Sequence, residues 1–200
     1  MLYFEKKFKK SGYSLIIGVD EVGRGSLAGP VVAAAVMLKN TSFRSRIDDS
    51  KRLTAGQREE AFPEIVGKSV FGIGIVDEKI VDRLNIAVAT QIAMEQAICE
   101  LIDKLGELRD QKIRVLIDGN VKPDITHPFT NIIKGDSRSK SIACASILAK
   151  VIRDRIMSIY HNAYPQYGFA RHKGYGTRLH KYAIRKFGLC AIHRTTFCDA

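Results

Sequence analysis

Residues 15–39 read LIIGVDEVGRGSLAGPVVAAAVMLK, and this stretch decides the fold. It contains two apolar runs, within residues 14–20 and 31–39, on either side of a glycine-rich segment. Apolar runs of this length, rich in β-branched residues, are typical of buried strands. The glycines between them predict a tight connection, because glycine adopts backbone conformations that other residues avoid.

The same patterning predicts further strands at residues 69–76, 113–118 and 129–133. A capping-box pattern at 54–57 predicts a helix towards residue 65, and apolar periodicity predicts helices at 86–105, 139–160 and 177–187. Early strands followed by helix–strand alternation indicate an α/β chain with a mixed sheet covered by helices. The length of 200 residues suits a single domain over 1–200, with a basic helical extension packed on it from about residue 160.

The net charge of +11 is unevenly distributed along the chain. Residues 1–133 hold 19 basic and 18 acidic side chains, whereas residues 134–200 hold 13 basic and three acidic ones. This asymmetry favours a nucleic acid or an anionic membrane as partner, although a merely solubilising surface produces the same excess. Tyr182, Ile184 and Phe187 are too few to make the last helix a membrane-binding one.

Several features exclude a secreted or membrane-spanning protein. No apolar run reaches the ~18 residues of a membrane-spanning helix. Residues 1–13 carry charges where a signal peptide has its apolar stretch. The four cysteines form no C-x-x-C pair and no disulfide framework, which fits a reducing compartment. We therefore expect a cytoplasmic protein that does not bind membranes.

Four carboxylates lie at the ends of predicted elements: Asp20, Glu21, Asp118 and Asp136. A single acidic residue there is usually a turn former or a helix cap. If the first and fourth strands are neighbours, however, the first three carboxylates converge where open α/β sheets place their sites. Oxygen ligands without histidine or cysteine favour Mg²⁺ or Mn²⁺. Two such ions ~4 Å apart suit in-line displacement at a phosphodiester.

The segment Gly23-Arg-Gly-Ser-Leu-Ala-Gly29 has a competing interpretation as a dinucleotide-binding loop. Its spacing is G-x-G-x-x-x-G rather than G-x-G-x-x-G, and a proline and a β-prone run follow it instead of a helix. The two acidic residues upstream would also repel a pyrophosphate. We therefore expect these glycines to let the backbone approach a ligand, with Arg24 supplying a planar set of donors.

Taken in order, these segments resemble ribonuclease HII, the type 2 ribonuclease H, over nearly the whole chain after the N-terminal arm. The most specific blocks are GVDEVGRGSLAGP at 18–30 and, within 134–150, KGD followed by SIACASILAK. Shorter blocks are DSKRLT at 49–54, LNI at 84–86, IDG at 117–119, YP at 164–165, HKGYGT at 172–177 and HR at 193–194. Ser26 and Cys144 replace a proline and an alanine that are common in the family. The sister family, ribonuclease HIII, usually has lysine in place of Arg24 and an extra N-terminal domain.

The resemblance implies an RNase H-like fold, a mixed five-stranded sheet flanked by helices with a small C-terminal helical extension. It implies that Asp20, Glu21, Asp118 and Asp136 are catalytic and bind Mg²⁺ or Mn²⁺, two ions in the substrate complex. The implied activity is hydrolysis of the RNA strand of RNA–DNA hybrids. Nicking on the 5′ side of single ribonucleotides in duplex DNA is also implied, with 3′-hydroxyl and 5′-phosphate ends.

The resemblance also implies roles in substrate binding. Gly23, Arg24 and Gly25 would sense the 2′-hydroxyl, the group that distinguishes RNA from DNA. Tyr175 would pack against the sugar of the following nucleotide. Further candidates would contact backbone phosphates rather than bases: Lys51, Arg138, Lys140, His172, Lys173, Arg178, Lys181 and Arg185.

Two classes of function remain open. The first is a monomeric metal-dependent endonuclease that takes RNA–DNA hybrids and ribonucleotide-containing duplex DNA. The alternative is a non-catalytic nucleic-acid-binding module that uses the basic C-terminal third. The four carboxylates beside Arg24 and Tyr175 favour the enzyme, because a binding module has no use for acidic groups that face phosphate. Cys190, His193 and Cys198 lack the spacing of a zinc site.

Overall fold

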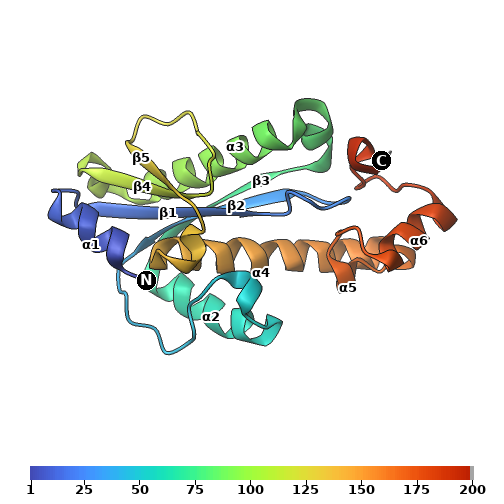
Figure 1. Ribbon diagram of the computed structural model, residues 1–200, viewed down its shortest axis with the longest axis horizontal. Coiled ribbons are helices and arrows are strands. Elements are labelled where there is room, and N and C mark those ends of the chain that lie inside the picture. Colours follow the sequence, from blue (N-terminus) through green and yellow to red (C-terminus); the bar gives the residue numbers. More distant parts are fainter. Residues whose placement is uncertain (199–200) are drawn as a thin grey trace.

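The computed structural model describes residues 1–198, and its centre is a five-stranded sheet with the order β3-β2-β1-β4-β5 (Figure 1). The strands are β1 (Leu15–Val22), β2 (Val31–Leu38), β3 (Ser69–Val76), β4 (Ile113–Asp118) and β5 (Phe129–Ile132). β2 pairs antiparallel with β1 and β3, whereas β4 pairs parallel with β1 and β5. The predicted mixed sheet is therefore confirmed, and β1 and β4 are neighbours.

Helices cover both faces of this sheet. The helices of the described residues are α1 (Tyr3–Lys10), α2 (Ala55–Lys68), α3 (Glu78–Lys104), α4 (Lys140–Ala163), α5 (Phe169–His172), α6 (Arg178–Phe187) and α7 (Thr195–Cys198). Short 3₁₀ turns are η1 (Ser50–Arg52), η2 (Gly106–Asp110), η3 (Gly135–Ser137) and η4 (Pro165–Tyr167). Figure 1 shows α3 on one side of the sheet, α4 with α2 on the other, and α5 and α6 at the far end of α4. Among the described residues, no helix combines the length and hydropathy needed to cross a bilayer.

Small residues let the two long helices lie close to the sheet. Ala89, Ala93 and Ala97 of α3 are fully buried against one face. A Cβ atom at Gly74 of β3 would lie 1.8 Å from the carbonyl oxygen of Ala93, so only glycine fits at this contact. The alternating glycines of this strand, Gly72 and Gly74, are typical of such a close approach. On the other face, α4 presents residues 143–145, which are also small and fully buried.

The structure differs from the predicted elements at two places. The helix predicted at 86–105 begins at Glu78, where Asp77 caps it, and Asn85 interrupts its helical backbone with φ 69° and ψ 166°. The apolar periodicity predicted only the part of this helix that follows Asn85, because the pattern does not extend across the interruption. The N-terminal arm, for which no element was predicted, forms α1.

The C-terminal segment packs on the far end of α4 through its own apolar cluster. Met157 of α4 lies in this cluster with Tyr167, Phe169 and Ile192. The predicted last helix is α6, with Thr177 as its N-cap and Gly188 as its C-cap. Assignment of residues 1–200 to a single domain stays a prediction.

Gly18 of β1 is the closest contact between the sheet and α4. A Cβ atom there would lie 2.3 Å from the backbone nitrogen of Ile142 and 2.3 Å from the carbonyl carbon of Ser141. Both are backbone atoms, so neither can rotate away. The glycine therefore fixes the start of α4 against the strand that carries Asp20.

We expect Gly18→Ala to lower the free energy of unfolding by about 1–3 kcal/mol or more, because it overpacks this contact. Gly67→Ala is the matched control, since Gly67 lies in α2 with no atom within 4 Å of its added Cβ. That variant should be neutral or more stable, by up to about 1 kcal/mol. Urea denaturation of both variants measures the difference, and equal stabilities would contradict the close-packing argument.

Candidate active site

The parallel pairing of β1 and β4 places Asp20 beside Asp118. Val19 is in register with Ile117, and each acidic residue comes next along its strand. Asp136 reaches the same point from η3, and the Gly135 N–H donates a 2.5 Å hydrogen bond to Asp118 Oδ1. Oxygen atoms of the three aspartates lie within 4.8 Å of one another. The convergence predicted for Asp20, Glu21 and Asp118 therefore holds for Asp20 and Asp118, and the structure adds Asp136 to them.

Glu21 lies at the edge of this cluster rather than among its three ligand atoms. One of its oxygens forms a 3.2 Å ion pair with Arg24. The other oxygen, Oε2, is buried and has no hydrogen-bond partner within residues 1–198. Burial raises the pKa of Glu21, and the Arg24 guanidinium opposes that rise. An unpartnered buried carboxylate oxygen is available to a cation.

Burial and mutual repulsion oppose ionisation of the aspartates. Asp20 is 4% exposed, and burial, followed by the charges of Glu21 and Asp118, raises its pKa well above the usual range. The pKa of Asp136 rises to about 6, mainly because of burial and then through repulsion by Asp118 and Asp49. Burial is the larger cause of both shifts and repulsion by neighbouring carboxylates is the second, so the ionised cluster favours a counter-charge.

Few cations of the protein lie near the three aspartates. Lys51 Nζ lies 3.9 Å from Asp136 Oδ2, but this lysine side chain is 82% exposed. Such a pair is weak, because solvent screens it. Buried carboxylate oxygens in excess, without nitrogen or sulfur donors, suit a hard divalent cation. Asp20, Asp118 and Asp136 would hold it, with Glu21 beside them.

Two buried arginines connect the glycine-rich segment to the rest of the molecule. Arg153 of α4 donates to the carbonyl oxygens of Pro30 and Ala28, at 2.8 and 3.1 Å. Arg194 donates to the carbonyl oxygens of Gly29 and Arg24, at 2.7 and 3.0 Å. Both arginines are 0% exposed. They leave the Arg24 side chain, which is 47% exposed, at the surface beside Glu21.

The sequence analysis assigned no role to these two arginines. A signal existed for Arg153, because it follows Ala149 by four residues and so lies on the apolar stripe of α4. A charged residue on such a stripe is buried with partners or marks a site. The HR block at 193–194 included Arg194 in the family resemblance, but its role was not predictable because its acceptors come from a distant loop.

Tyr175 lies beside the glycine-rich segment. Its backbone forms an isolated antiparallel bridge with Ser26. Lys150 Nζ and the Arg153 guanidinium lie 5.7 and 5.4 Å from the centre of its half-buried ring. Gly23 has φ +96°, and a Cβ there would lie 2.3 Å from Arg153 Nε, whereas nothing lies within 4 Å of a Cβ at Gly25. The structure thus brings the predicted loop and the predicted tyrosine together.

The predicted phosphate-binding residues occupy different surroundings. Arg178, Lys181 and Arg185 are exposed on α6. Lys173 Nζ donates to Ser158 Oγ at 2.9 Å. His172 is only 8% exposed. Its Nε2 lies 2.8 Å from the carbonyl oxygen of Tyr167.

His172 is therefore part of the C-terminal core rather than of a binding surface. Its ring stacks on that of His180 with centroids 4.4 Å apart, and burial lowers its pKa. Inclusion of this histidine among the phosphate-binding candidates does not fit its burial. The remaining two candidates lie near the start of α4, where Arg138 lies over the Phe4 ring and Lys140 donates to the carbonyl oxygen of Thr41.

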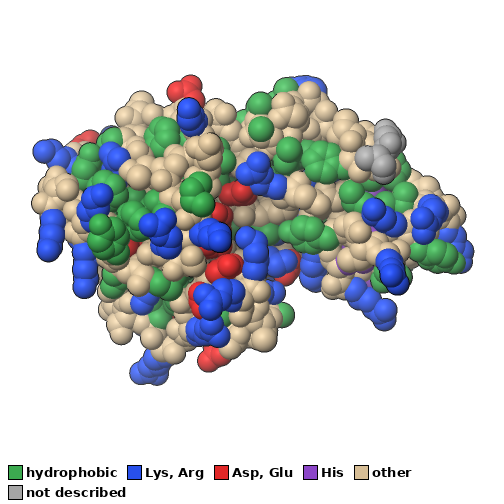
Figure 2. All heavy atoms as spheres, in the orientation of Figure 1, with side chains coloured by type: hydrophobic (Ala, Val, Ile, Leu, Met, Phe, Trp, Pro, Cys, Tyr) green, Lys and Arg blue, Asp and Glu red, His purple; other side chains and the backbone are tan. Residues whose placement is uncertain are grey.

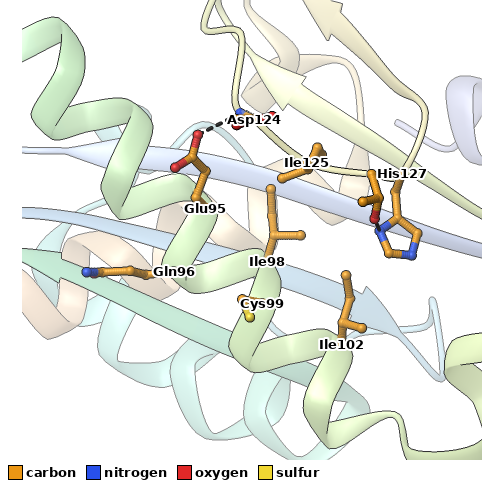
Figure 3. Close-up of a pocket in the computed structure, with 9 residues that line it drawn as sticks. Glu95, Gln96, Ile98, Cys99, Ile102, Asp124, Ile125 and His127 are labelled. Atoms are coloured by element: carbon orange, nitrogen blue, oxygen red, sulfur yellow. Dashed lines mark hydrogen bonds between the residues drawn. The ribbon is translucent and has the colours of Figure 1, made fainter.

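The acid cluster borders a broad face of the molecule rather than an enclosed cavity, although Asp20 and Asp136 are themselves buried. Figure 2 shows acidic side chains near the middle of this face with lysine and arginine side chains around them. A cavity of about 490 Å³ lies elsewhere, between α3 and residues 124–127, and contains none of the four acidic residues (Figure 3). Its walls include the apolar side chains of Ile98, Ile102 and Ile125. An open face suits a polymer, which an enclosed cavity would not admit.

The fold and the site together define a class of protein. Carboxylates at the ends of parallel strands, on a face that carries basic groups, are typical of metal-dependent nucleases. Residues 17–200 match the ribonuclease HII family. The chain belongs to that family and is a metal-dependent ribonuclease, as the sequence resemblance predicted.

The sequences of curated relatives from this family align with almost the entire chain. Ribonuclease HII of Ruminiclostridium cellulolyticum is 51% identical over 198 residues, which cover 98% of this chain and 75% of that protein. Ribonuclease HII of Acetivibrio thermocellus is 50% identical with the same coverage.

Solved structures show the same fold. The structure of the PCNA:RNase HII complex from Archaeoglobus fulgidus matches with a TM-score of 0.72 and 23% identity, over 90% of this chain and 94% of that one. Bst-RNase HIII in complex with Mn²⁺ matches with a TM-score of 0.69 and 20% identity, over 94% of this chain and 69% of that one. At these identities the similarity concerns the fold.

We expect Mg²⁺ to stabilise the protein at pH 8 and to do so much less at pH 5, because Asp136 has a pKa of about 6. A raised pKa means that the stability this group contributes is present at low pH and is lost as the pH rises through about 6. A bound cation offsets that loss only where the carboxylate is ionised. Thermal unfolding with and without Mg²⁺ measures the effect.

Asp136→Asn is the control for this prediction. It removes the titrating group, so the Mg²⁺ effect on Tm should be small at both pH values. An Mg²⁺ stabilisation of equal size at pH 5 and pH 8 in the unmodified protein would contradict the assignment of Asp136 to a cation site.

Proposed function

We propose that this ribonuclease hydrolyses the RNA strand of RNA–DNA hybrids. We also propose that it nicks duplex DNA on the 5′ side of single embedded ribonucleotides, leaving 3′-hydroxyl and 5′-phosphate ends. The observation that carries the proposal is the cluster of Asp20, Asp118 and Asp136 on an open face, with Arg24 and Tyr175 nearby. These groups have different tasks, since the acids suit a reaction at phosphate and the loop suits recognition of a sugar.

Asp20, Glu21, Asp118 and Asp136 are the proposed catalytic residues and would hold Mg²⁺ or Mn²⁺, two ions when substrate is bound. Such ions activate a water molecule and stabilise the leaving oxygen of a phosphodiester. The protein's own contribution is to orient the carboxylates. The Glu21 N–H donates to Asp20 Oδ1 at 2.7 Å, and the Gly135 N–H donates to Asp118 Oδ1.

Recognition of the ribonucleotide is proposed for the loop and the tyrosine. Gly25 has open space around it, so its backbone is accessible to a 2′-hydroxyl, and the Arg24 guanidinium is exposed next to it. Gly23 has a packing role as well, because Arg153 occupies the space of a side chain there. The Tyr175 ring would pack against the next sugar, held in place by its bridge to Ser26.

The remaining contacts are proposed for backbone phosphates. Exposed positive charges would position the duplex without reading its sequence. The proposed residues are Lys51, Arg138, Lys140, Lys173, Arg178, Lys181 and Arg185. We further propose that the protein acts as a monomer in the cytoplasm, where the thiols of Cys99, Cys144 and Cys190 would stay reduced.

We expect Asp118→Asn to reduce cleavage of an RNA–DNA hybrid by more than about 100-fold while hybrid binding persists, because the variant loses a proposed metal ligand and keeps the basic surface. Gel-based cleavage with Mg²⁺ and with Mn²⁺, together with a binding titration, measures both properties. Unchanged turnover would refute the metal site. Hybrid binding without cleavage by the unmodified protein, with either metal, would instead favour the non-catalytic binding module as the main role of this surface.

We expect Tyr175→Ala to slow nicking at a single embedded ribonucleotide by about 10-fold or more, since the packing of an aromatic ring on a nucleotide contributes about 1–3 kcal/mol. Tyr175→Phe keeps the ring and should retain the rate to within about threefold. Single-turnover cleavage and Tm are measured for both variants. If the alanine variant loses stability and the rate of its folded fraction is unchanged, the tyrosine has a structural role only.

A further inference from the structure

Glu5 of α1 is a buried carboxylate outside the acid cluster, and it contacts the start of α4. It is 7% exposed, and its Oε1 accepts three hydrogen bonds. The donors are Ser139 Oγ at 2.7 Å, the Ser141 N–H at 3.0 Å and Ser141 Oγ at 3.0 Å. Its Oε2 is buried with no hydrogen-bond partner, and no lysine or arginine pairs with it among residues 1–198.

Such a group is costly to bury without a cation. The favourable part of its surroundings is the beginning of α4, where Ser139 is the N-cap and the unpaired N–H groups favour a negative charge. Glu5 therefore supplements the cap of α4 from a separate helix. The backbone also joins the N-terminal segment to the start of α4. The Lys140 N–H donates to the carbonyl oxygen of Met1 at 2.8 Å, and Leu2 forms an isolated β-bridge with Ser139.

The residues that Glu5 holds are the ones that position Asp136. The Ser139 N–H donates to the carbonyl oxygen of Gly135 at 2.8 Å, so the N-cap and η3 form one hydrogen-bonded unit. The opposite side of this unit rests on the sheet, through the contact between Gly18 and Ser141 and through the hydrogen bond from Gly135 to Asp118. Glu5 is the carboxylate that accepts hydrogen bonds from Ser139 and Ser141 at the start of α4.

We propose that Glu5 is a positioning residue for the metal site: its carboxylate fixes the first turn of α4 and thereby the distance of Asp136 from Asp20 and Asp118. This inference rests on the proposed function only in taking that cluster as the site of metal-dependent cleavage. Because a displaced ligand weakens metal binding before it affects the remote basic surface, loss of Glu5 acts on metal affinity and turnover rather than on hybrid binding.

The test compares Glu5→Ala with Phe8→Ala. Phe8 lies in the same helix and packs against the apolar cluster of Ile16, Leu116 and Ile142, so its removal also loosens α1. It makes no hydrogen bond to the start of α4. Three quantities are measured for each variant: Mg²⁺ and Mn²⁺ affinity by calorimetric titration, single-turnover cleavage as a function of Mg²⁺, and Tm.

We expect Glu5→Ala to weaken metal affinity by about tenfold or more and to raise the half-saturating Mg²⁺ concentration for cleavage equally, with KM for the hybrid changed less than about twofold. Phe8→Ala should lower Tm and leave metal affinity unchanged. Glu5→Gln keeps an oxygen acceptor for the serines, so it should recover part of the metal affinity. If the alanine variant does not fold, Glu5→Gln replaces it in the comparison with Phe8→Ala.

Unchanged metal affinity in both Glu5 variants would overturn the proposal. So would equal losses of metal affinity in Glu5→Ala and Phe8→Ala at equal Tm, because Glu5 would then have only a structural role. If the unmodified protein binds metal without cleaving hybrids, the proposed substrate is wrong, and the calorimetric comparison still decides the role of Glu5.

Discussion

Repulsion between carboxylates is the constraint on which the rest of this structure depends. Oxygen atoms of Asp20, Asp118 and Asp136 lie within 4.8 Å of one another, and two of these side chains are almost fully buried. At an effective dielectric of about 20, two full charges at such a distance repel by roughly 3–4 kcal/mol. The hydrogen-bonded sheet, the close approach of α4 to Gly18 and the bond from Gly135 to Asp118 hold them there. The fold thus stores an unfavourable arrangement that a divalent cation makes favourable.

The buried arginines have a different role: they hold an irregular loop beside that cluster. Residues 23–30 lie outside the paired strands, and Arg153 and Arg194 donate hydrogen bonds to four of their carbonyl oxygens. A buried guanidinium is expensive by itself, and burial lowers the pKa of Arg194 to about 10, which still leaves it protonated at neutral pH. Arg153 also donates to the carbonyl oxygen of Lys173 at 2.8 Å, so one side chain orders both the glycine-rich loop and the segment that carries Tyr175.

The sequence predicts the elements of this site better than the connections between them. The strands and the positions of Asp20 and Asp118 follow from local apolar patterning, since an acidic residue that ends a buried strand keeps that place in the fold. The roles of Glu5, Arg153 and Arg194 depend on partners more than 100 residues away, and no local pattern identifies those partners. His172 and Lys173 illustrate the same limit: they are neighbours at the end of the four-residue helix α5, which is too short for a periodicity to indicate which side chain is buried.

The burial of Arg153 and Arg194 also changes the interpretation of the positive charge in the C-terminal third. Its 13 lysine and arginine residues suggested a surface for a polyanion, yet Arg153 and Arg194 are completely buried and bind backbone carbonyl groups instead. A partner molecule responds to exposed charge, so the formal excess overstates the binding surface of this segment. The exposed part is concentrated on α6, where Arg178, Lys181 and Arg185 lie in the open. The two buried charges serve the same substrate indirectly, because they order the loop and the tyrosine that would contact its sugars.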